Sequence, residues 1–361
     1  MQTILIFSND TFMLWKFRRE LIRTMITSSM DVIIAAPQGP HRDDLETMGC
    51  KLLTTPKDAF GSTPAKDRAL YRRYVSIIRE TKPSMVLSYG PKANICGGLA
   101  CRKLKTPHCA CIQGLGTLFQ SPVKGFFSTL MFRAALKKAK VVFFENTANE
   151  AVLRARKIVK RQQTLVLPGA GVNLQHYALA PYPDNDPVRF LYLGRMTRDK
   201  GTDELLSAIK MLYDDCFEVR LDLLGTYDDA YSEQMRQLQD RGIVFHHGFQ
   251  GDPRPYYAAT DCVVMPSYHE GMSNVLLEAA ATGRPIIATY IPGCREAVDE
   301  GRTGFTCRSQ DKYGLYNAMK KILQMTRDQR REMGLAGRRR MEELFDKQAV
   351  VEETMHAIFK P

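Results

Sequence analysis

At 361 residues the chain is long enough for two domains, and its 44% hydrophobic and 25% charged residues exclude wholesale disorder. No apolar run reaches the roughly 18 residues that a membrane-spanning helix requires, and residues 3–8 are expected to form a buried first strand rather than part of a leader. The nine cysteines form no CxxC pair, so reduced core thiols in a reducing compartment are expected.

The charge is divided unevenly along the chain. Residues 1–167 carry 27 Lys and Arg against 11 Asp and Glu, a net charge of +16, whereas the remainder carries 24 against 28, a net charge of −4. A basic half joined to a slightly acidic half suggests that the first half faces a polyanion. Nucleic acid, an anionic membrane surface and a diphosphate-bearing substrate all fit this charge, and so does a merely solvated basic surface.

The first half alternates short apolar strands with amphipathic helices, which predicts a parallel sheet covered by helices on both faces. The predicted strands are 3–7, 32–36, 52–54, 85–88, 108–112, 141–144 and 165–167. The predicted helices are 17–27, 43–48, 65–81, 93–103 and 126–138. Residues 168–187 then carry four prolines and two glycines, which is the composition of a linker.

The same alternation restarts after the linker and predicts a second sheet of the same class. Its strands are 189–193, 219–224, 244–247, 262–266, 285–288 and 304–306. Its helices are 203–212, 232–240, 254–259, 274–282, 313–325 and 329–344. The fold class is therefore α/β, with one doubly wound domain at 1–167 and another at 168–345. A last helix at about 346–361 is expected to pack back on the first domain.

A glycine-flanked loop rich in cations follows the strand that opens the second half. Gly194 and Arg195 begin this loop, and Lys200 and Gly201 end it just before a helix. Ligands of open parallel sheets bind at the carboxyl ends of strands, and cations beside a helix N-terminus suit a diphosphate. A group of ordinary surface cations would give the same pattern.

Two carboxylates lie eight residues apart after the strand at 262–266. Glu270 is in the loop and Glu278 is in the first turns of the next helix, so that one carboxylate can reach a sugar and the other a ribose. The start of this helix, capped by Ser273, supplies further candidates: the outward-pointing amides of Gly271, Met272 and Ser273, and Asn274 as the first helical residue. The spacing alone also fits an exposed Glu278 and a Glu270 in an ordinary turn.

Taken together and in this order, these segments closely resemble the retaining family 4 glycosyltransferases of GT-B fold. In the second half the resemblance rests on Gly194-Arg195…Lys200-Gly201, Glu270, Glu278-Ala279, Gly283-Arg284-Pro285-Ile286, Pro292-Gly293 and Glu296. In the first half it rests on Phe17-Arg18…Leu21-Ile22, Gln113-Gly114-Leu115-Gly116-Thr117…Phe119, Glu145-Asn146 and Leu167-Pro168-Gly169…Gly171-Val172-Asn173. The likeness covers essentially the whole chain. The first-half segments look like the bacterial branch that extends undecaprenyl-diphosphate-linked saccharides for O-antigen, capsule or glycoprotein glycans.

The resemblance implies two Rossmann-like domains facing across a cleft, with the nucleotide sugar on the second domain. It implies that Arg195 and Lys200 hold the diphosphate, and that Glu270, with the amides after it, holds the sugar hydroxyls. Glu278 would hold the ribose. The catalytic residues are then Glu270, Arg195 and Lys200. The implied reaction moves a hexose or N-acetylhexosamine from a UDP-sugar to a lipid-diphosphate-linked saccharide with retention. It needs no cofactor and no essential metal, and it takes place in the cytoplasm on the inner face of the membrane.

The first-half loops depart from the family pattern. Gln113 stands where many members have a histidine, and glutamine forms hydrogen bonds without exchanging a proton near neutral pH. Gln113 and Gly114 are therefore predicted to orient the sugar. The first loop lacks the paired glycines that many members place against the sugar donor, and Asn9 or Asp10 is predicted to face the acceptor instead.

Two patterns suggest metal binding and are interpreted otherwise. Asp184-Asn185-Asp186 matches a DxD motif but lies in the linker. His246 and His247 are adjacent in a strand, so their side chains alternate to opposite faces.

The helix at 126–138 mixes apolar and basic residues. Phe126, Phe127 and Leu130 precede Arg133 and Lys138, which suits an anionic membrane surface, and a core-facing helix with a solvated end fits equally well.

Two rival functions remain. A non-hydrolysing UDP-sugar epimerase would act without an acceptor. A basic nucleic-acid-binding module should show aromatic-rich basic strands or a recognition helix, which the sequence lacks, so no nucleic-acid partner is expected.

Overall fold

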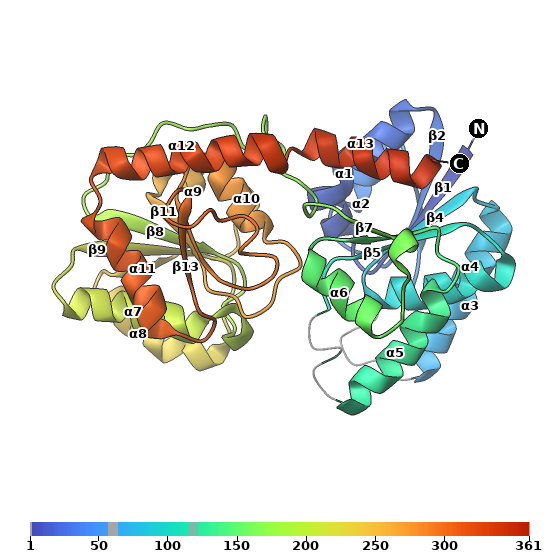
Figure 1. The fold of residues 1–361 in the computed structure, drawn as a ribbon, viewed down its shortest axis with the longest axis horizontal. Coiled ribbons are helices and arrows are strands. Elements are labelled where there is room, and N and C mark those ends of the chain that lie inside the picture. The colour runs from blue at the N-terminus through green and yellow to red at the C-terminus, as the bar shows by residue number, and fades with distance from the viewer. Residues whose placement is uncertain (1, 57–63, 116–118, 120–121, 361) are drawn as a thin grey trace. The chain divides into compact units, whose positions relative to one another are not determined.

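Each of the thirteen predicted strands is present in the computed structural model, which describes residues 2–56, 64–115, 119 and 122–360 (Figure 1). The chain divides into two units, one made of Met1–Ala170 with Gln348–Pro361 and the other of Gly171–Lys347. Each unit is built on its own parallel sheet, as the alternation predicted. Within the described residues, no helix combines the length and the apolar character that crossing a membrane requires.

The sheet of the first unit has seven strands in the order β3-β2-β1-β4-β5-β6-β7. They are β1 (Gln2–Ser8), β2 (Met30–Ala36), β3 (Lys51–Thr54), β4 (Met85–Tyr89), β5 (His108–Ile112), β6 (Val141–Phe144) and β7 (Thr164–Val166). The strand order reverses between β1 and β4, which places the topological switch point of this sheet beside Asn9.

Helices cover both faces of this sheet. They are α1 (Thr11–Thr27), α2 (Arg42–Thr47), α3 (Pro64–Thr81), the π-helical turn η1 (Ala93–Gly97), α4 (Gly98–Leu104), α5 (Pro122–Leu136), α6 (Thr147–Ala155), the 3-10 turn η2 (Arg161–Gln163) and α13 (Lys347–Phe359). Ile4 and Ile6 of β1 pack with α1, α2 and α13, whereas Leu5 and Phe7 face α3 and α4. The last helix is therefore part of the core of the first unit.

The sheet of the second unit has six strands in the order β10-β9-β8-β11-β12-β13. They are β8 (Val188–Leu193), β9 (Val219–Leu224), β10 (Val244–His246), β11 (Cys262–Met265), β12 (Ile286–Thr289) and β13 (Gly304–Cys307). The other elements are η3 (Arg198–Lys200), α7 (Thr202–Asp214), η4 (Asp229–Tyr231), α8 (Ser232–Asp240), α9 (Arg254–Ala259), α10 (Asn274–Ala281), α11 (Lys312–Gln324) and α12 (Arg327–Leu344). Here the switch point lies between β8 and β11.

Side-chain caps account for two departures from the predicted helices. α1 begins six residues before the predicted start at 17, because the Asp10 carboxylate accepts a hydrogen bond from the Phe12 amide at 2.9 Å. α6 was not predicted, and Asn146 caps it by accepting from the Asn149 amide at 2.8 Å.

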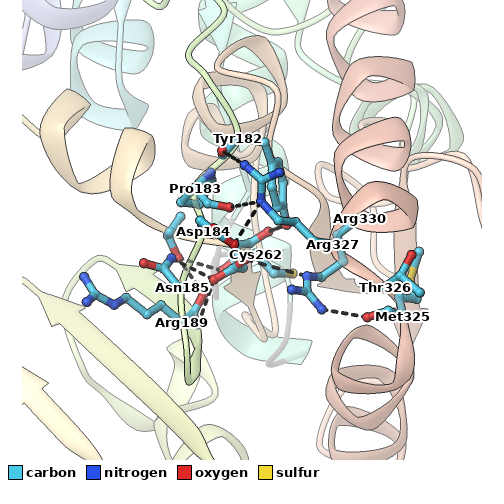
Figure 2. A network of polar contacts seen from close by, with 12 residues as sticks. Tyr182, Pro183, Asp184, Asn185, Arg189, Cys262, Met325, Thr326, Arg327 and Arg330 are labelled. Carbon is cyan, nitrogen blue, oxygen red and sulfur yellow. Dashed lines mark hydrogen bonds and ion pairs between the residues drawn. The ribbon is translucent and has the colours of Figure 1, made fainter.

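Arginine side chains of α12 hold the linker against the second unit (Figure 2). Arg327 donates to the carbonyl oxygens of Tyr182 and Pro183, each at 2.9 Å, and lies 3.3 Å from the Asp184 carboxylate. The Asn185 amide donates to Asp261 at 2.8 Å. The DxD-like pattern therefore takes part in anchoring the linker.

A buried ion pair lies beneath this anchor. Arg330 and Asp261 are 6% and 0% exposed, and their Nε and Oδ1 atoms are 3.6 Å apart. All nine cysteines are free, as expected for thiols, and all except Cys216 are buried.

Candidate active site

The loop after β8 turns sharply at Gly201 before α7 begins. Gly201 has a φ of 73°, and a Cβ atom at this position would overlap the carbonyl oxygen of Pro266, which follows β11. Glycine fits both constraints because it has no Cβ atom and adopts a positive φ without strain. Alongside it, the Tyr268 amide donates to the Asp199 carbonyl oxygen at 2.9 Å. The loops after β8 and β11 are therefore joined through their backbones.

Replacing Gly201 with Ala is expected to lower the free energy of unfolding by about 1–3 kcal/mol, since the new side chain meets both the left-handed φ and the Pro266 carbonyl. Chemical denaturation followed by circular dichroism measures this change. Gly242→Ala is the matched control, because Gly242 has a φ of 71° but no atom within 4 Å of its would-be Cβ. Equal losses in the two variants would show that the contact with Pro266 contributes nothing.

Lys200 and Glu270 form an ion pair at this junction. The Lys200 Nζ lies 2.6 Å from the Glu270 Oε1, and their side chains are 21% and 17% exposed. The sequence assigned these residues to different parts of the sugar donor, and their direct contact was not predicted. Because β8 and β11 are neighbours at the switch point, both side chains lie where an open parallel sheet binds its ligand.

Two further predicted residues belong to the same loop as Lys200. The Gly194 amide donates to the Leu224 carbonyl oxygen at 2.9 Å, so Gly194 links the β8 loop to β9. The Arg195 side chain is exposed, while its carbonyl oxygen accepts from the Tyr192 hydroxyl at 2.8 Å. Because this hydrogen bond fixes the Arg195 backbone and its guanidinium is exposed, the side chain is available to bind an anion from solution.

The predicted role of Ser273 needs correction. Ser273 occupies the N-cap position of α10, but its side chain makes no capping hydrogen bond, and its amide donates inward to the Gly293 carbonyl oxygen at 2.8 Å. The reason is the close approach of the loop after β12, where a Cβ on Gly293 would lie 2.5 Å from the Gly271 carbonyl oxygen. Glu296 holds this loop by accepting from the Gly293 amide at 2.7 Å. The predicted residues Met272 and Asn274 flank this cap, Met272 being 5% exposed and Asn274 the first residue of α10.

Glu278 lies inside α10 and is only 5% exposed, so it is not a solvated helical residue. Its Oε2 accepts a hydrogen bond from the Tyr257 hydroxyl at 2.9 Å. Burial, followed by the nearby Glu278 carboxylate, raises the pKa of both Tyr177 and Tyr257, so both phenols stay protonated. The carboxylate is therefore a positioned acceptor beside two phenols.

The predicted acceptor-side residues follow strands of the first sheet. Asn9 is exposed after β1, and Gln113 and Gly114 follow β5. The Asp10 carboxylate also caps α1, a role that the sequence did not assign to it. Gly116 and Thr117 of the same predicted motif lie outside the described residues.

Sequence reasoning missed a buried ion pair beneath these loops. Arg18 of α1 and Glu145 after β6 are 2.7 Å apart, with side chains 10% and 13% exposed, and the Arg18 guanidinium lies 5.3 Å from the Tyr89 ring centre. Burial, the largest single cause, lowers the pKa of Arg18, but Glu145, Tyr89 and Cys111 together raise it by more, so the net pKa is raised. An arginine on the apolar face of α1 was the available sequence signal.

No group of three or more His, Cys, Asp or Glu side chains is arranged as metal ligands in the described parts of the chain. His246 Nε2 lies 2.7 Å from the Gly225 carbonyl oxygen, and His247 Nε2 lies 2.7 Å from Asp222. Both histidines are therefore used within the β9–β10 edge of the sheet.

Two family models match the chain, one described as glycosyl transferase 4-like over residues 4–146 and one as glycosyl transferases group 1 over residues 187–325. The chain belongs to this family of glycosyltransferases. The family, the enzyme class and the two-domain α/β fold predicted from the sequence are thus confirmed.

Two curated relatives match this glycosyltransferase along most of their length. It is 22% identical over 346 residues to the N,N'-diacetylbacillosaminyl-diphospho-undecaprenol alpha-1,3-N-acetylgalactosaminyltransferase of Campylobacter jejuni, covering 90% of this chain and 89% of that protein. It is 25% identical over 351 residues to the capsular polysaccharide biosynthesis glycosyltransferase CapM of Staphylococcus aureus, covering 93% of this chain and 91% of CapM. Anabaena HepE, solved with UDP and glucose, has the same fold, with a TM-score of 0.79, 17% identity and 99% of both chains covered.

Proposed function

We propose that this glycosyltransferase moves a hexose or N-acetylhexosamine from a UDP-sugar to a lipid-diphosphate-linked saccharide, with retention at the anomeric carbon. The observation that carries the proposal is the Lys200–Glu270 pair at the switch point of the second sheet. This pair places a cation that can bind a diphosphate, Lys200, next to a carboxylate that can accept hydrogen bonds from sugar hydroxyls, Glu270. The name of the Campylobacter relative supports the acceptor, and the UDP and glucose of HepE support the sugar donor.

The proposed mechanism follows from where charge develops. As UDP departs, its diphosphate gains negative charge and the sugar gains oxocarbenium character. Arg195 and Lys200 stabilise the diphosphate most in the transition state, and the Glu270 carboxylate favours the developing cation. The acceptor hydroxyl attacks the face that the diphosphate leaves, and the diphosphate takes its proton. The two cations supply the charge that a divalent metal would otherwise provide, so this scheme requires no metal.

The roles of the remaining residues follow the same scheme. The Glu278 carboxylate, beside Tyr257, receives the ribose hydroxyls of the UDP. Gly271, Met272 and Asn274 surround the sugar at the start of α10. Asn9, Gln113 and Gly114 orient the acceptor or the sugar from the first unit.

Incubating the enzyme with a panel of UDP-sugars and short-chain lipid-diphosphate acceptors tests this proposal. We expect a glycosylated acceptor and one UDP per transfer, with the configuration of the new bond read by NMR. Conversion of a UDP-sugar without acceptor would favour the epimerase instead. An inverted anomeric configuration would contradict the retaining mechanism.

We also propose that α5 places the enzyme on an anionic membrane surface, at the inner face of the cytoplasmic membrane. Phe132 and Leu136 of this helix are buried in the first unit, at 1% and 0% exposure. The opposite face exposes 61% of Phe126, 61% of Phe127 and 46% of Leu130. One face of α5 thus packs into the core of the first unit, and the other face exposes apolar side chains. The first unit also carries a strongly positive charge, which favours an anionic surface.

Binding to vesicles containing phosphatidylglycerol should weaken sharply as salt rises, because the attraction is screened within a Debye length of about 10 Å at 0.1 M. At low salt, replacing both Phe126 and Phe127 with Ser should reduce co-sedimentation with these vesicles relative to the wild type. Tyr313→Ser is the control, since Tyr313 is also 61% exposed but belongs to the second unit. Equal binding to neutral and anionic vesicles would mean that the charge asymmetry serves another purpose.

A further inference from the structure

A crevice between α4 and α5 lies at the amino end of β5, at the opposite edge of the sheet from Asn9 and Gln113. Its volume is about 290 Å³, and its lining includes Arg102, Lys105, His108 and Lys138. The two helices approach closely beside it, since a Cβ on Gly98 would lie 2.7 Å from the Ala135 carbonyl oxygen. None of these residues belongs to the proposed transfer site.

The charge of this crevice is positive. Three of its lining residues are cations and none is a carboxylate. The surrounding segment, residues 81–144, carries ten Lys and Arg and no Asp or Glu. Arg102 is held over α5 because its Nη1 donates to the Ala134 carbonyl oxygen at 3.1 Å. Three cations around one concave surface favour an anion with several oxygen atoms.

Hydrogen bonds fix the tautomer of His108, which is 2% exposed. The Asn94 Nδ2 donates to the Cys111 carbonyl oxygen at 2.9 Å, so the Asn94 Oδ1 accepts the Ser88 hydroxyl proton at 2.7 Å. With its single proton used, Ser88 must accept from the His108 Nε2–H at 2.8 Å. The Nδ1 atom of His108 therefore carries a lone pair.

This lone pair has no hydrogen-bond partner among the described residues. A buried acceptor left unpaired is destabilising, and His108 lines the crevice, so a ligand bound there can supply the missing donor. Burial lowers the pKa of His108 to about 4, which keeps the ring neutral and Nδ1 an acceptor near pH 7. A simple anion without a hydrogen atom would leave this nitrogen unpaired.

We propose that the crevice binds a phosphate group that carries, or lies next to, a hydroxyl group. The phosphate oxygens contact Arg102, Lys105 and Lys138, and the hydroxyl donates to the His108 Nδ1. Inorganic phosphate, a soluble phosphate monoester and the glycerol headgroup of an anionic lipid share this chemistry. The site is separate from sugar transfer and does not depend on the function proposed above.

Titrating inorganic phosphate into the full chain labelled with ¹⁵N-histidine tests the site. We expect a saturable shift of one imidazole signal among the seven histidines, assigned to His108 by its loss in His108→Gln. The Lys105→Gln/Lys138→Gln variant should weaken binding about fivefold or more, because two of the three cations are gone. The matched control is Lys103→Gln/Lys137→Gln, which removes the same charge from exposed neighbours outside the crevice.

Co-sedimentation with phosphatidylglycerol vesicles distinguishes the source of the phosphate. If the crevice variant loses vesicle binding and the control variant keeps it, the ligand is a lipid headgroup. If both variants bind vesicles alike but only the crevice variant loses the phosphate shift, the ligand is a soluble phosphate. If phosphate gives no saturable shift and both variants sediment alike, the proposal is overturned. Transfer to a short soluble acceptor should stay at the wild-type rate in the crevice variant, which separates this result from a failure of the proposed function.

Discussion

Replacing Lys200 with Ala is expected to lower kcat/KM by about 30-fold to 1000-fold and to weaken UDP binding, which corresponds to about 2–4 kcal/mol. Two effects add in this variant. The diphosphate loses a partly desolvated cation, and Glu270, 2.6 Å away in the wild type, is left as an unpaired carboxylate that repels the diphosphate. Steady-state kinetics and calorimetric titration with UDP measure both losses.

The double variant Lys200→Ala/Glu270→Gln separates these two effects. Removing the carboxylate should restore part of the UDP affinity without restoring turnover, and the size of the recovery gives the coupling of the pair. Lys210→Ala is the control, because Lys210 forms an exposed ion pair with Asp214 on α7. Near-normal turnover in Lys200→Ala, with unchanged far-UV circular dichroism, would refute the assignment of the diphosphate site.

The fold could be predicted because both sheets are parallel and covered on both faces. A strand such as β11 is buried throughout, so it appears in the sequence as a continuous apolar run. The start of α1 and the whole of α6 were harder to predict. Each depends on one cap, Asp10 or Asn146, and a cap is recognised only once the backbone before it is known to be extended.

The residues of the candidate site could be predicted from the sequence, but their contacts could not. Lys200 and Glu270 follow strands β8 and β11, which are neighbours in the sheet although β9 and β10 lie between them in sequence. The inward amide of Ser273 likewise depends on Gly293, twenty residues away. Local spacing contains no information on such pairings, because they arise from strand order and from the close packing of loops.

Glu270→Gln and Glu278→Gln should affect catalysis and binding differently. In Glu270→Gln the shape is kept, but the charge that favours the developing cation is lost, so turnover should fall by about 100-fold or more. UDP affinity should stay equal or increase, because Lys200 no longer has a carboxylate partner and is fully available to the diphosphate. Without the structure, only a modest change in affinity would be expected. The Lys200–Glu270 ion pair predicts the direction of the change in UDP affinity.

Glu278→Gln should instead raise the Kd for UDP by about tenfold, since a neutral amide accepts weaker hydrogen bonds from ribose hydroxyls. The Tyr257 hydroxyl can still donate to the Gln side-chain oxygen, so the thermal midpoint should change little, and this serves as the control for folding. Calorimetric titration and product formation measure both variants. If Glu270→Gln loses UDP binding and Glu278→Gln does not, the two roles are reversed. If both variants transfer sugar at the wild-type rate, the sugar donor binds elsewhere, because no arrangement of these two carboxylates around a UDP-sugar leaves both without effect.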